Sequence, residues 1–186
     1  MIGFAMCGSF CTLRRALVEM ERLTATFDVQ GIVSENVYST DTRFARAADI
    51  VDEIGELTGK SVIHSIVEAE PLGPTSPLEA LIICPCTGNT LAKMANGITD
   101  SAVTMAAKAH LRGNRPLVIA LASNDALSAN LKNIGEMLTR KHVYFVPMKQ
   151  DDPDRKPHSL VADFSLLPET LEAALAGKQY QRIFQV

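Results

Sequence analysis

The segment from Ile82 to Ser101, with the sequence IICPCTGNTLAKMANGITDS, carries polar side chains suited to ligand binding. Pro85 is expected to end an apolar run, and Gly88 permits an unusual backbone angle shortly after it. Asn89 and Thr90 then stand where a helix begins and exposes unpaired N–H groups. The Asn89 amide offers a donor and an acceptor in one plane, which suits the edge of a planar heterocycle or a carboxylate. A capped helix start without any ligand is the alternative interpretation.

The segment CGSFCT, residues 7–12, has the composition of a phosphate-binding turn. Gly8 allows a tight turn after an apolar run, and Ser9 is placed to cap the following helix, whose N-terminus attracts anions. The segment lacks the second and third glycines of the GxGxxG dinucleotide fingerprint, so a mononucleotide suits it better than NAD. An ordinary strand-to-helix turn is the alternative.

The segment 34–43 is rich in hydroxyl groups and ends with an arginine at the start of the next expected helix. These residues are Ser34, Ser39, Thr40, Thr42 and Arg43. Hydroxyl and guanidinium groups are good phosphate donors, because each makes short directional hydrogen bonds. In the alternative interpretation, Asp41 or Thr42 caps the helix and Arg43 is solvated.

Four cysteines lie beside apolar runs: Cys7, Cys11, Cys84 and Cys86. We expect reduced thiols, because the chain otherwise resembles an intracellular protein. Strands that are neighbours in a sheet would bring the four thiols together as a metal or redox site. The spacings are not the C-x2-C pairs of zinc sites, so we favour buried thiols and expect no metal.

Short apolar runs alternate with amphipathic stretches along the whole chain. The expected strands cover residues 1–6, 27–34, 61–64, 79–85, 116–123 and 142–147, and the expected helices cover 13–25, 43–59, 90–98, 102–113 and 126–141, with a last helix after residue 168. Strands followed by helices imply a parallel sheet covered on both faces. We therefore predict a single domain, residues 1–186, with a three-layer α/β/α fold and a six-stranded parallel sheet in the order 3-2-1-4-5-6.

Two proline-rich segments, residues 68–77 and 147–157, interrupt this alternation and are expected to be surface loops. The apolar residues of the tail YQRIFQV, residues 180–186, are expected to dock on the body or on a neighbouring chain. In a parallel sheet the segments 7–12, 34–43, 84–90 and 122–125 would meet at the carboxyl ends of the strands, where ligands bind.

Composition argues against nucleic acid and membrane as partners. The chain has 186 residues, 47% hydrophobic and 21% charged, with a formal net charge of -3. Its lysines and arginines form no basic stripe interleaved with aromatic residues. The apolar N-terminus has no positively charged region before it and is too short to span a bilayer, so we expect a cytoplasmic protein.

The stretch PCTGNTLAKMANGITD, residues 85–100, resembles the P-x-[ST]-x-N-T-x-x-K-x-A-x-G-x-x-D signature of the flavin-binding Cys-decarboxylase superfamily. The resemblance implies a Rossmann-like flavoprotein fold, bound FMN, and a homo-oligomer built as a trimer or as multiples of trimers. It implies an FMN phosphate on Gly8, Ser9 and Ser34, with Phe10 and Thr87 flanking the flavin. The full set of implied cofactor-binding residues is Gly8, Ser9, Phe10, Ser34, Ser39, Arg43, Pro85, Thr87, Asn89 and Thr90.

Further strings, among them STDTRF, AEPLGP, SNDAL and FVPMKQDDPDRKPHSLVA, resemble one family within that superfamily. Its members are flavoprotein-like subunits of enzymes that oxidise a dihydro ring dicarboxylate to pyridine-2,6-dicarboxylate in the mother cell of sporulating bacteria. The resemblance implies a second kind of subunit, which holds NADP or NAD, and a small dicarboxylate substrate. Asn89, Lys93, Asn124 and Arg43 are the candidates for binding the carboxylates. Asp125 is as well suited to cap a helix as to act on a substrate.

The chain also departs from the superfamily. The decarboxylases carry a Pro-x-Met-Asn-x-x-Met-Trp motif where this chain reads LASNDALS, and the chain has no tryptophan, so decarboxylation of cysteine peptides is not expected. His64 and Asn89 are the only candidates for a catalytic group, and no base is assigned. Two alternatives stay open: a flavin-free scaffold that docks through residues 147–159, and a metal or redox protein built on the cysteines.

Overall fold

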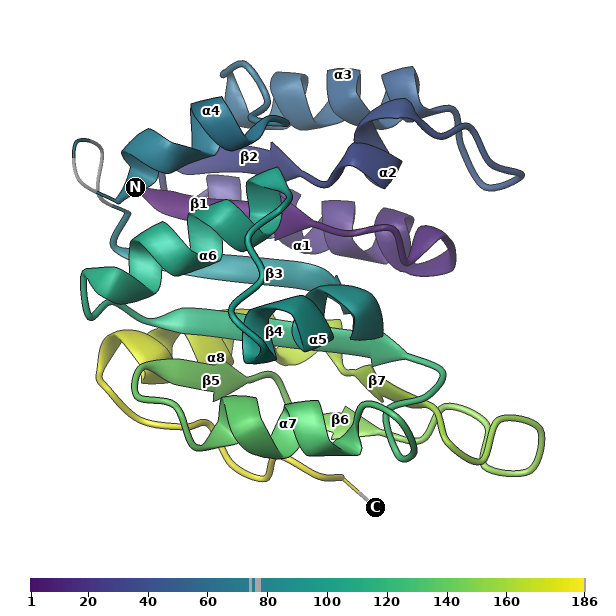
Figure 1. Ribbon diagram of the computed structural model, residues 1–186. Helices are drawn as coiled ribbons and strands as arrows, with labels where there is room; N and C mark the ends of the chain where they lie inside the picture. The colour runs from purple at the N-terminus through teal and green to yellow at the C-terminus, as the bar shows by residue number, and fades with distance from the viewer. Residues whose placement is uncertain (74, 76–77, 186) are drawn as a thin grey trace.

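The computed structural model of the protein describes residues 1–73, 75 and 78–185. Its centre is a sheet with five parallel strands, β1 (Ile2–Met6), β2 (Val29–Val33), β3 (Ala80–Thr87), β4 (Leu117–Ser123) and β5 (Val143–Phe145). They lie in the order β2-β1-β3-β4-β5 (Figure 1). Two short strands, β6 (Met148–Lys149) and β7 (Leu160–Ala162), are added by antiparallel pairing, with β7 beside the carboxyl end of β4.

Helices cover both faces of the sheet (Figure 1). One face is covered by α1 (Leu13–Thr24), α3 (Ala47–Thr58) and α8 (Leu167–Leu175), and the other by α4 (Ile66–Ala69), α5 (Gly88–Ala95), α6 (Ala102–Arg112) and α7 (Leu131–Leu138). The remaining elements are α2 (Glu35–Ser39) and the 3-10 turns η1 (Phe10–Thr12), η2 (Glu70–Leu72) and η3 (Phe164–Leu166). The three-layer α/β/α architecture predicted from the sequence is therefore confirmed.

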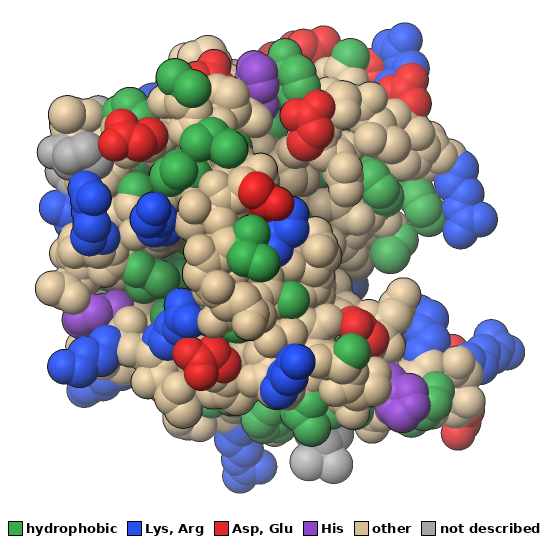
Figure 2. All heavy atoms as spheres, viewed as in Figure 1, with side chains coloured by type: hydrophobic (Ala, Val, Ile, Leu, Met, Phe, Trp, Pro, Cys, Tyr) green, Lys and Arg blue, Asp and Glu red, His purple; other side chains and the backbone are tan. Residues whose placement is uncertain are grey.

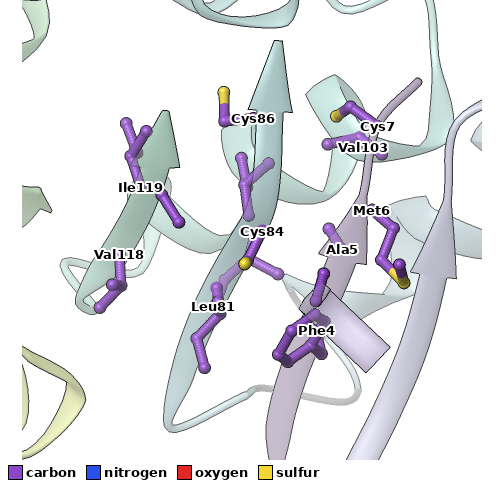
Figure 3. Close-up of a cluster of buried hydrophobic side chains, with 14 of the residues drawn as sticks. Phe4, Ala5, Met6, Cys7, Leu81, Cys84, Cys86, Val103, Val118 and Ile119 are labelled. Atoms are coloured by element: carbon purple, nitrogen blue, oxygen red, sulfur yellow. The ribbon is translucent and has the colours of Figure 1, made fainter. Parts of the chain in front are cut away.

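The strands are continuous apolar runs because helices bury both faces of the sheet. Every residue of β1 and of β4 is buried. Figure 3 shows Phe4, Leu81, Val103 and Val118 within this core. Packing of the helices onto a complete core fixes the strand ends, and the strand ends position the loops that follow them.

The sheet differs from the prediction in two respects. The third expected strand, residues 61–64, forms only one β-bridge, between Ile63 and Ile32. The segment is short because Gly59, with φ of 65°, ends α3, and Ser65 caps α4 directly afterwards. Within the described part of the chain the sheet has seven strands rather than six, and it is not wholly parallel, because the chain reverses between β6 and β7.

The segment 68–77 differs in part from the predicted surface loop, whereas the tail 180–185 lies on the body of the protein. The described part of the segment 68–77 contains η2 and buries Ala69 and Leu72, so it is not wholly exposed; residues 74, 76 and 77 lie outside the described residues. The tail docks on the body as predicted, since Met148 N donates to Ile183 O at 2.7 Å and Gln185 N donates to Met148 O at 2.9 Å. Residue 186 lies outside the described chain.

Candidate functional site

A cleft of about 700 Å³ lies beyond the carboxyl ends of β1, β3 and β4. The loops after these strands line it, together with Arg43 and Phe44 and the loop between β6 and β7. Figure 2 shows the hollow between two projecting parts of the surface. A smaller cavity of about 300 Å³ adjoins the cleft and shares Gly8, Thr87 and Asn89 with it. Ligands of open α/β sheets bind at this end of the strands.

Most of the residues predicted from the sequence meet around these two cavities. Those that line the larger cleft are Gly8, Ser9, Phe10, Arg43, Thr87, Asn89 and Asn124. Those that line the smaller cavity in addition to the shared residues are Ser34, Thr90 and Lys93. Ser39, His64 and Pro85 line neither cavity. The structure thus brings ten of the predicted positions to one edge of the sheet.

The loop between β1 and η1 forms one wall of both cavities. A Cβ atom at Gly8 would lie 3.3 Å from Asn36 Cβ and 3.4 Å from Phe10 Cζ, so a larger residue would crowd this wall. Ser9 does not cap with its side chain as expected: its carbonyl accepts from Thr12 N at 2.9 Å. Thr12 Oγ1 lies 2.9 Å from the Ser9 carbonyl oxygen and 3.0 Å from Ser9 Oγ, and its single proton serves one of them at a time. The Ser9 hydroxyl has no hydrogen-bond partner besides Thr12 among the described residues, and Ser9 lines the larger cleft.

The segment after β2 is divided between the site and the surface. Ser34 Oγ is buried and has no hydrogen-bond partner among the described residues. Ser39 instead donates to Glu35 O at 2.9 Å and is exposed. Asp41 accepts from Ala47 N at 2.8 Å at the start of α3, so the capping interpretation holds for this aspartate. The Arg43 guanidinium nevertheless lines the larger cleft and lies 4.8 Å from the centre of the Phe44 ring.

The connection between β3 and α5 is a polar turn. Thr87 caps α5, because its Oγ1 accepts from Thr90 N at 3.2 Å. Asn89 is exposed and lines both cavities. Pro85 does not end the strand as expected: β3 continues to Thr87, and its register shifts between Ile83 and Cys86. A bulge of this kind tolerates proline, which has no N–H group to donate to the ladder.

The turn after β4 holds a polar network at the floor of the cleft. Asp125 accepts from Ser123 Oγ at 2.5 Å and from Asn130 Nδ2 at 2.9 Å on each carboxylate oxygen. The hydrogen bond from Ser123, together with that from Asn130, lowers the pKa of Asp125 despite partial burial. The Asp125 side chain is therefore an ionised anchor of this turn and not a helix cap. Asn124 is left exposed in the cleft.

Two residues predicted to act on the substrate have other partners. Both carboxylate oxygens of Asp100 accept from Lys93 Nζ at 2.9 Å, and the hydrogen bond from Lys93 lowers the pKa of Asp100. The His64 ring stacks on the Tyr38 ring with centroids 3.8 Å apart, and His64 lines neither cavity.

Among the described residues, no helix is both long and apolar enough to cross a bilayer.

Comparison with known proteins places this geometry in a family. The model of the family described as "Flavoprotein" matches residues 1–162. The chain belongs to the Flavoprotein family. Its cleft lies at the carboxyl ends of the parallel strands, where open α/β sheets bind nucleotides.

Individual relatives of this flavoprotein are closer still. The chain is 47% identical over 183 residues to the B subunit of dipicolinate synthase from Bacillus subtilis (strain 168), an alignment that covers 98% of this chain and 92% of the relative. It superposes with a TM-score of 0.91 on the crystal structure of the B subunit of dipicolinate synthase from Bacillus halodurans, at 44% identity and covering 100% of this chain and 95% of that chain.

A more distant structure shares the fold. The dodecameric FMN-dependent UbiX-like decarboxylase from Escherichia coli O157:H7 superposes with a TM-score of 0.61 at 22% identity, covering 79% of this chain and 80% of that chain. At this identity the likeness establishes the three-layer fold alone.

The thiols of the flavoprotein form no metal centre within the described residues. Cys7, Cys84 and Cys86 are buried and Cys11 is exposed, and all four are free. Burial raises the pKa of the Cys7 thiol to about 11, and it also raises those of Cys84 and Cys86. Buried protonated thiols pack as small apolar side chains, so the metal alternative has no support in this part of the chain.

Several charged residues of the cleft were not predicted from the sequence. They are Arg15 on α1, and Asp151 and Lys156 on the loop between β6 and β7. Lys156 Nζ lies 2.9 Å from Asp151 Oδ2. Arg15 could have been predicted, because it lies four residues after Cys11 in the loop that follows β1, and residues four apart lie on the same side of a helix. No sequence signal places the loop 150–159 over the cleft, because that position depends on the antiparallel pairing of β7 with β4.

Proposed function

We propose that this chain is the flavin-binding B subunit of a dipicolinate synthase. In this proposal the whole chain, residues 1–186, acts as one domain in the mother-cell cytoplasm of a sporulating bacterium. It works with the A subunit of dipicolinate synthase, which holds NADP or NAD, to oxidise dihydrodipicolinate to dipicolinate, pyridine-2,6-dicarboxylate. The observation that carries the proposal is the 47% identity to the B subunit of Bacillus subtilis dipicolinate synthase over 98% of the chain.

The residues around the smaller cavity fit the phosphate of FMN. Ser34 Oγ is buried there with no partner among the described residues, and a phosphate oxygen would satisfy it. The Ser9 hydroxyl, whose only partner among the described residues is Thr12, can donate to a phosphate oxygen, and Gly8 leaves room that a Cβ would reduce. We therefore assign the phosphate to the junction of the two cavities, where Gly8 lines both, Ser34 and Thr90 line the smaller one, and Ser9 lines the larger one.

The larger cleft fits a planar ring and a small substrate. Phe10 is half-buried at its wall, and Thr87 and Asn89 line the cleft from the β3–α5 turn, so we assign these three residues to the flavin. A volume of about 700 Å³ is within the usual range of cofactor sites. Pro85 supports this wall from within β3, and its carbonyl accepts from Cys7 N at 3.1 Å. Ser39 has no part in the assignment, since it lies outside both cavities.

Bound FMN would supply a hydride acceptor beside the substrate, and the gain of ring aromaticity would favour the oxidation. The chain's own contribution is to orient the substrate and balance its charge. Asn89 and Asn124 offer amide donors within the cleft, and the ionised Asp125 fixes the turn that carries Asn124. No side chain is assigned as a catalytic base, because His64 stacks on Tyr38 away from the cleft.

The proposal includes a homo-oligomer, a trimer or a multiple of trimers. Two observations support it: the related decarboxylase from Escherichia coli is dodecameric, and an apolar cavity of about 490 Å³ lies between α5 and α6, next to exposed Ile98. Exposed apolar patches of this kind mark interaction surfaces. We expect light scattering at micromolar concentration to report an assembly larger than a monomer, and a monomer would contradict this part of the proposal.

The test of the proposed function is reconstitution. The purified chain is mixed with FMN, the A subunit, dihydrodipicolinate and NADP or NAD, and the ultraviolet absorbance of dipicolinate is followed. We expect Asn89→Leu, which replaces an amide that lines both cavities with a larger apolar group, to abolish product formation that depends on the chain. Asn96→Leu is the matched control, because Asn96 lies at the other end of α5 and lines neither cavity. Product formation that does not require the chain would contradict the proposal.

A further inference from the structure

The larger cleft is lined by more cationic than anionic side chains, and within the described part of the chain two of the cations are free to bind a ligand. Its cations are Arg15, Arg43 and Lys156, and its carboxylates are Asp125 and Asp151. Asp125 already accepts three hydrogen bonds from Ser123 and Asn130, so its oxygens are occupied. Neither Arg15 nor Arg43 forms an ion pair with any residue that the structure describes. The cleft is therefore suited to an anion.

Arg15 is held in a defined orientation. Its guanidinium carbon lies 5.0 Å from the centre of the Phe164 ring, and stacking of this kind restrains the guanidinium plane. The neighbouring Arg14 points elsewhere and pairs with Glu53. A restrained guanidinium can offer two parallel N–H groups to one carboxylate at a small entropic cost.

Lys156 reaches the same cleft from the loop between β6 and β7. Its Nζ pairs with Asp151 Oδ2 at 2.9 Å, and the Lys156 side chain is half exposed. The hydrogen bond to Asp151 and the charge of that carboxylate raise the pKa of Lys156. An exposed ion pair is weak and readily exchanged, so a substrate carboxylate can replace Asp151.

We propose that Arg15 and Lys156 bind the two carboxylates of a dianionic ring ligand, and that Asp151 holds the Lys156 ammonium until the ligand arrives. The identity of the ligand as a pyridine dicarboxylate rests on the proposed function. The assignment replaces Lys93, whose ammonium is engaged by both oxygens of Asp100 in the smaller cavity. One carboxylate anchor thus comes from α1 and the other from the loop between β6 and β7.

The test is a calorimetric titration of the FMN-loaded full chain with dipicolinate and, separately, with pyridine-2-carboxylate. We expect Arg15→Gln and Lys156→Gln each to weaken dipicolinate binding about tenfold, because each removes one charge-assisted contact. Pyridine-2-carboxylate has one carboxylate, so only one of the two substitutions should weaken its binding. The matched controls are Arg14→Gln on the same helix and Lys149→Gln on the same hairpin, which should leave binding unchanged.

Asp151→Asn separates ligand binding from a merely structural role. It removes the competitor for Lys156, so we expect dipicolinate to bind several times more tightly to this variant. Unchanged affinity in Arg15→Gln and Lys156→Gln, weaker binding in Asp151→Asn, or absence of dipicolinate binding by the unsubstituted chain would each overturn the proposal. If the unsubstituted chain does not bind FMN but the variants change dipicolinate affinity as predicted, the flavin assignment would be overturned and this inference would be supported.

Discussion

Replacement of Gly88 by alanine should destabilise the protein by about 2 kcal/mol, within the range of roughly 1–3 kcal/mol that overpacking costs. A Cβ atom at Gly88 would lie 2.4 Å from Ser123 Oγ, 2.6 Å from Asn130 Nδ2 and 2.9 Å from Asp125 Oδ1. These three side chains are bonded to one another, so none can move away without weakening the network at the cleft floor. The substitution should therefore weaken dipicolinate binding as well as stability.

The assay is urea-induced unfolding followed by circular dichroism. Gly135→Ala is the matched control, because Gly135 lies within α7 and a Cβ there would meet no atom within 4 Å. Alanine in that position should stabilise the helix by about 0.5–1 kcal/mol. Equal effects of Gly88→Ala and Gly135→Ala on the free energy of unfolding would refute the packing argument, because only at Gly88 would the added Cβ meet other side chains.

Three further predictions follow from the same geometry. Ser34→Ala should leave the free energy of unfolding of the FMN-free chain unchanged or raise it by up to about 1 kcal/mol, because the hydroxyl is buried without a partner among the described residues. The same substitution should lower the affinity for FMN about tenfold, as measured by fluorescence titration. Asp125→Asn should reduce the free energy of unfolding at neutral pH, and the difference between the variant and the unsubstituted chain should shrink well below pH 3.8. The pKa of Asp125 is lowered in the folded state, so its carboxylate stabilises the fold fully above the ordinary pKa of 3.8. That stabilisation is lost as the pH falls through the lower pKa of the folded state. Iodoacetamide at neutral pH should modify one thiol of the native protein by mass spectrometry, and none in Cys11→Ser, because the other three cysteines are buried; modification of Cys7 in the native state would contradict this.

The positions of the main strands were predictable because a sheet buried on both faces requires uninterrupted apolar runs, and their order followed from the doubly wound α/β topology. The runs at 1–6, 27–34, 79–85, 116–123 and 142–147 became β1 to β5 in the expected arrangement. The segment 61–64 was not predictable as a single bridge, since its shortness depends on how α3 ends and α4 begins. The pairing of β7 with β4 is a long-range contact that no local pattern encodes.

The site was predictable where residues directly follow a strand. Gly8, Thr87, Asn89 and Asn124 meet because parallel strands end at one edge of the sheet. Arg15 was missed because a charged residue on an amphipathic helix normally faces solvent. The contact between Lys156 and the cleft was missed because it depends on the fold of the β6–β7 hairpin. Of the two candidates that lie further along the chain after β2, Arg43 lines the larger cleft and Ser39 lies outside both cavities, so distance from the strand end made these positions less predictable.

The visible absorption spectrum of the purified chain titrated with FMN tests the central claim most directly. We expect a stoichiometric yellow complex that releases FMN on heating and fails to form when Ser9 and Asn89 are replaced by bulkier residues. A colourless protein that does not bind FMN, yet restores dipicolinate formation when mixed with the A subunit, would contradict the account and identify the chain as a flavin-free scaffold.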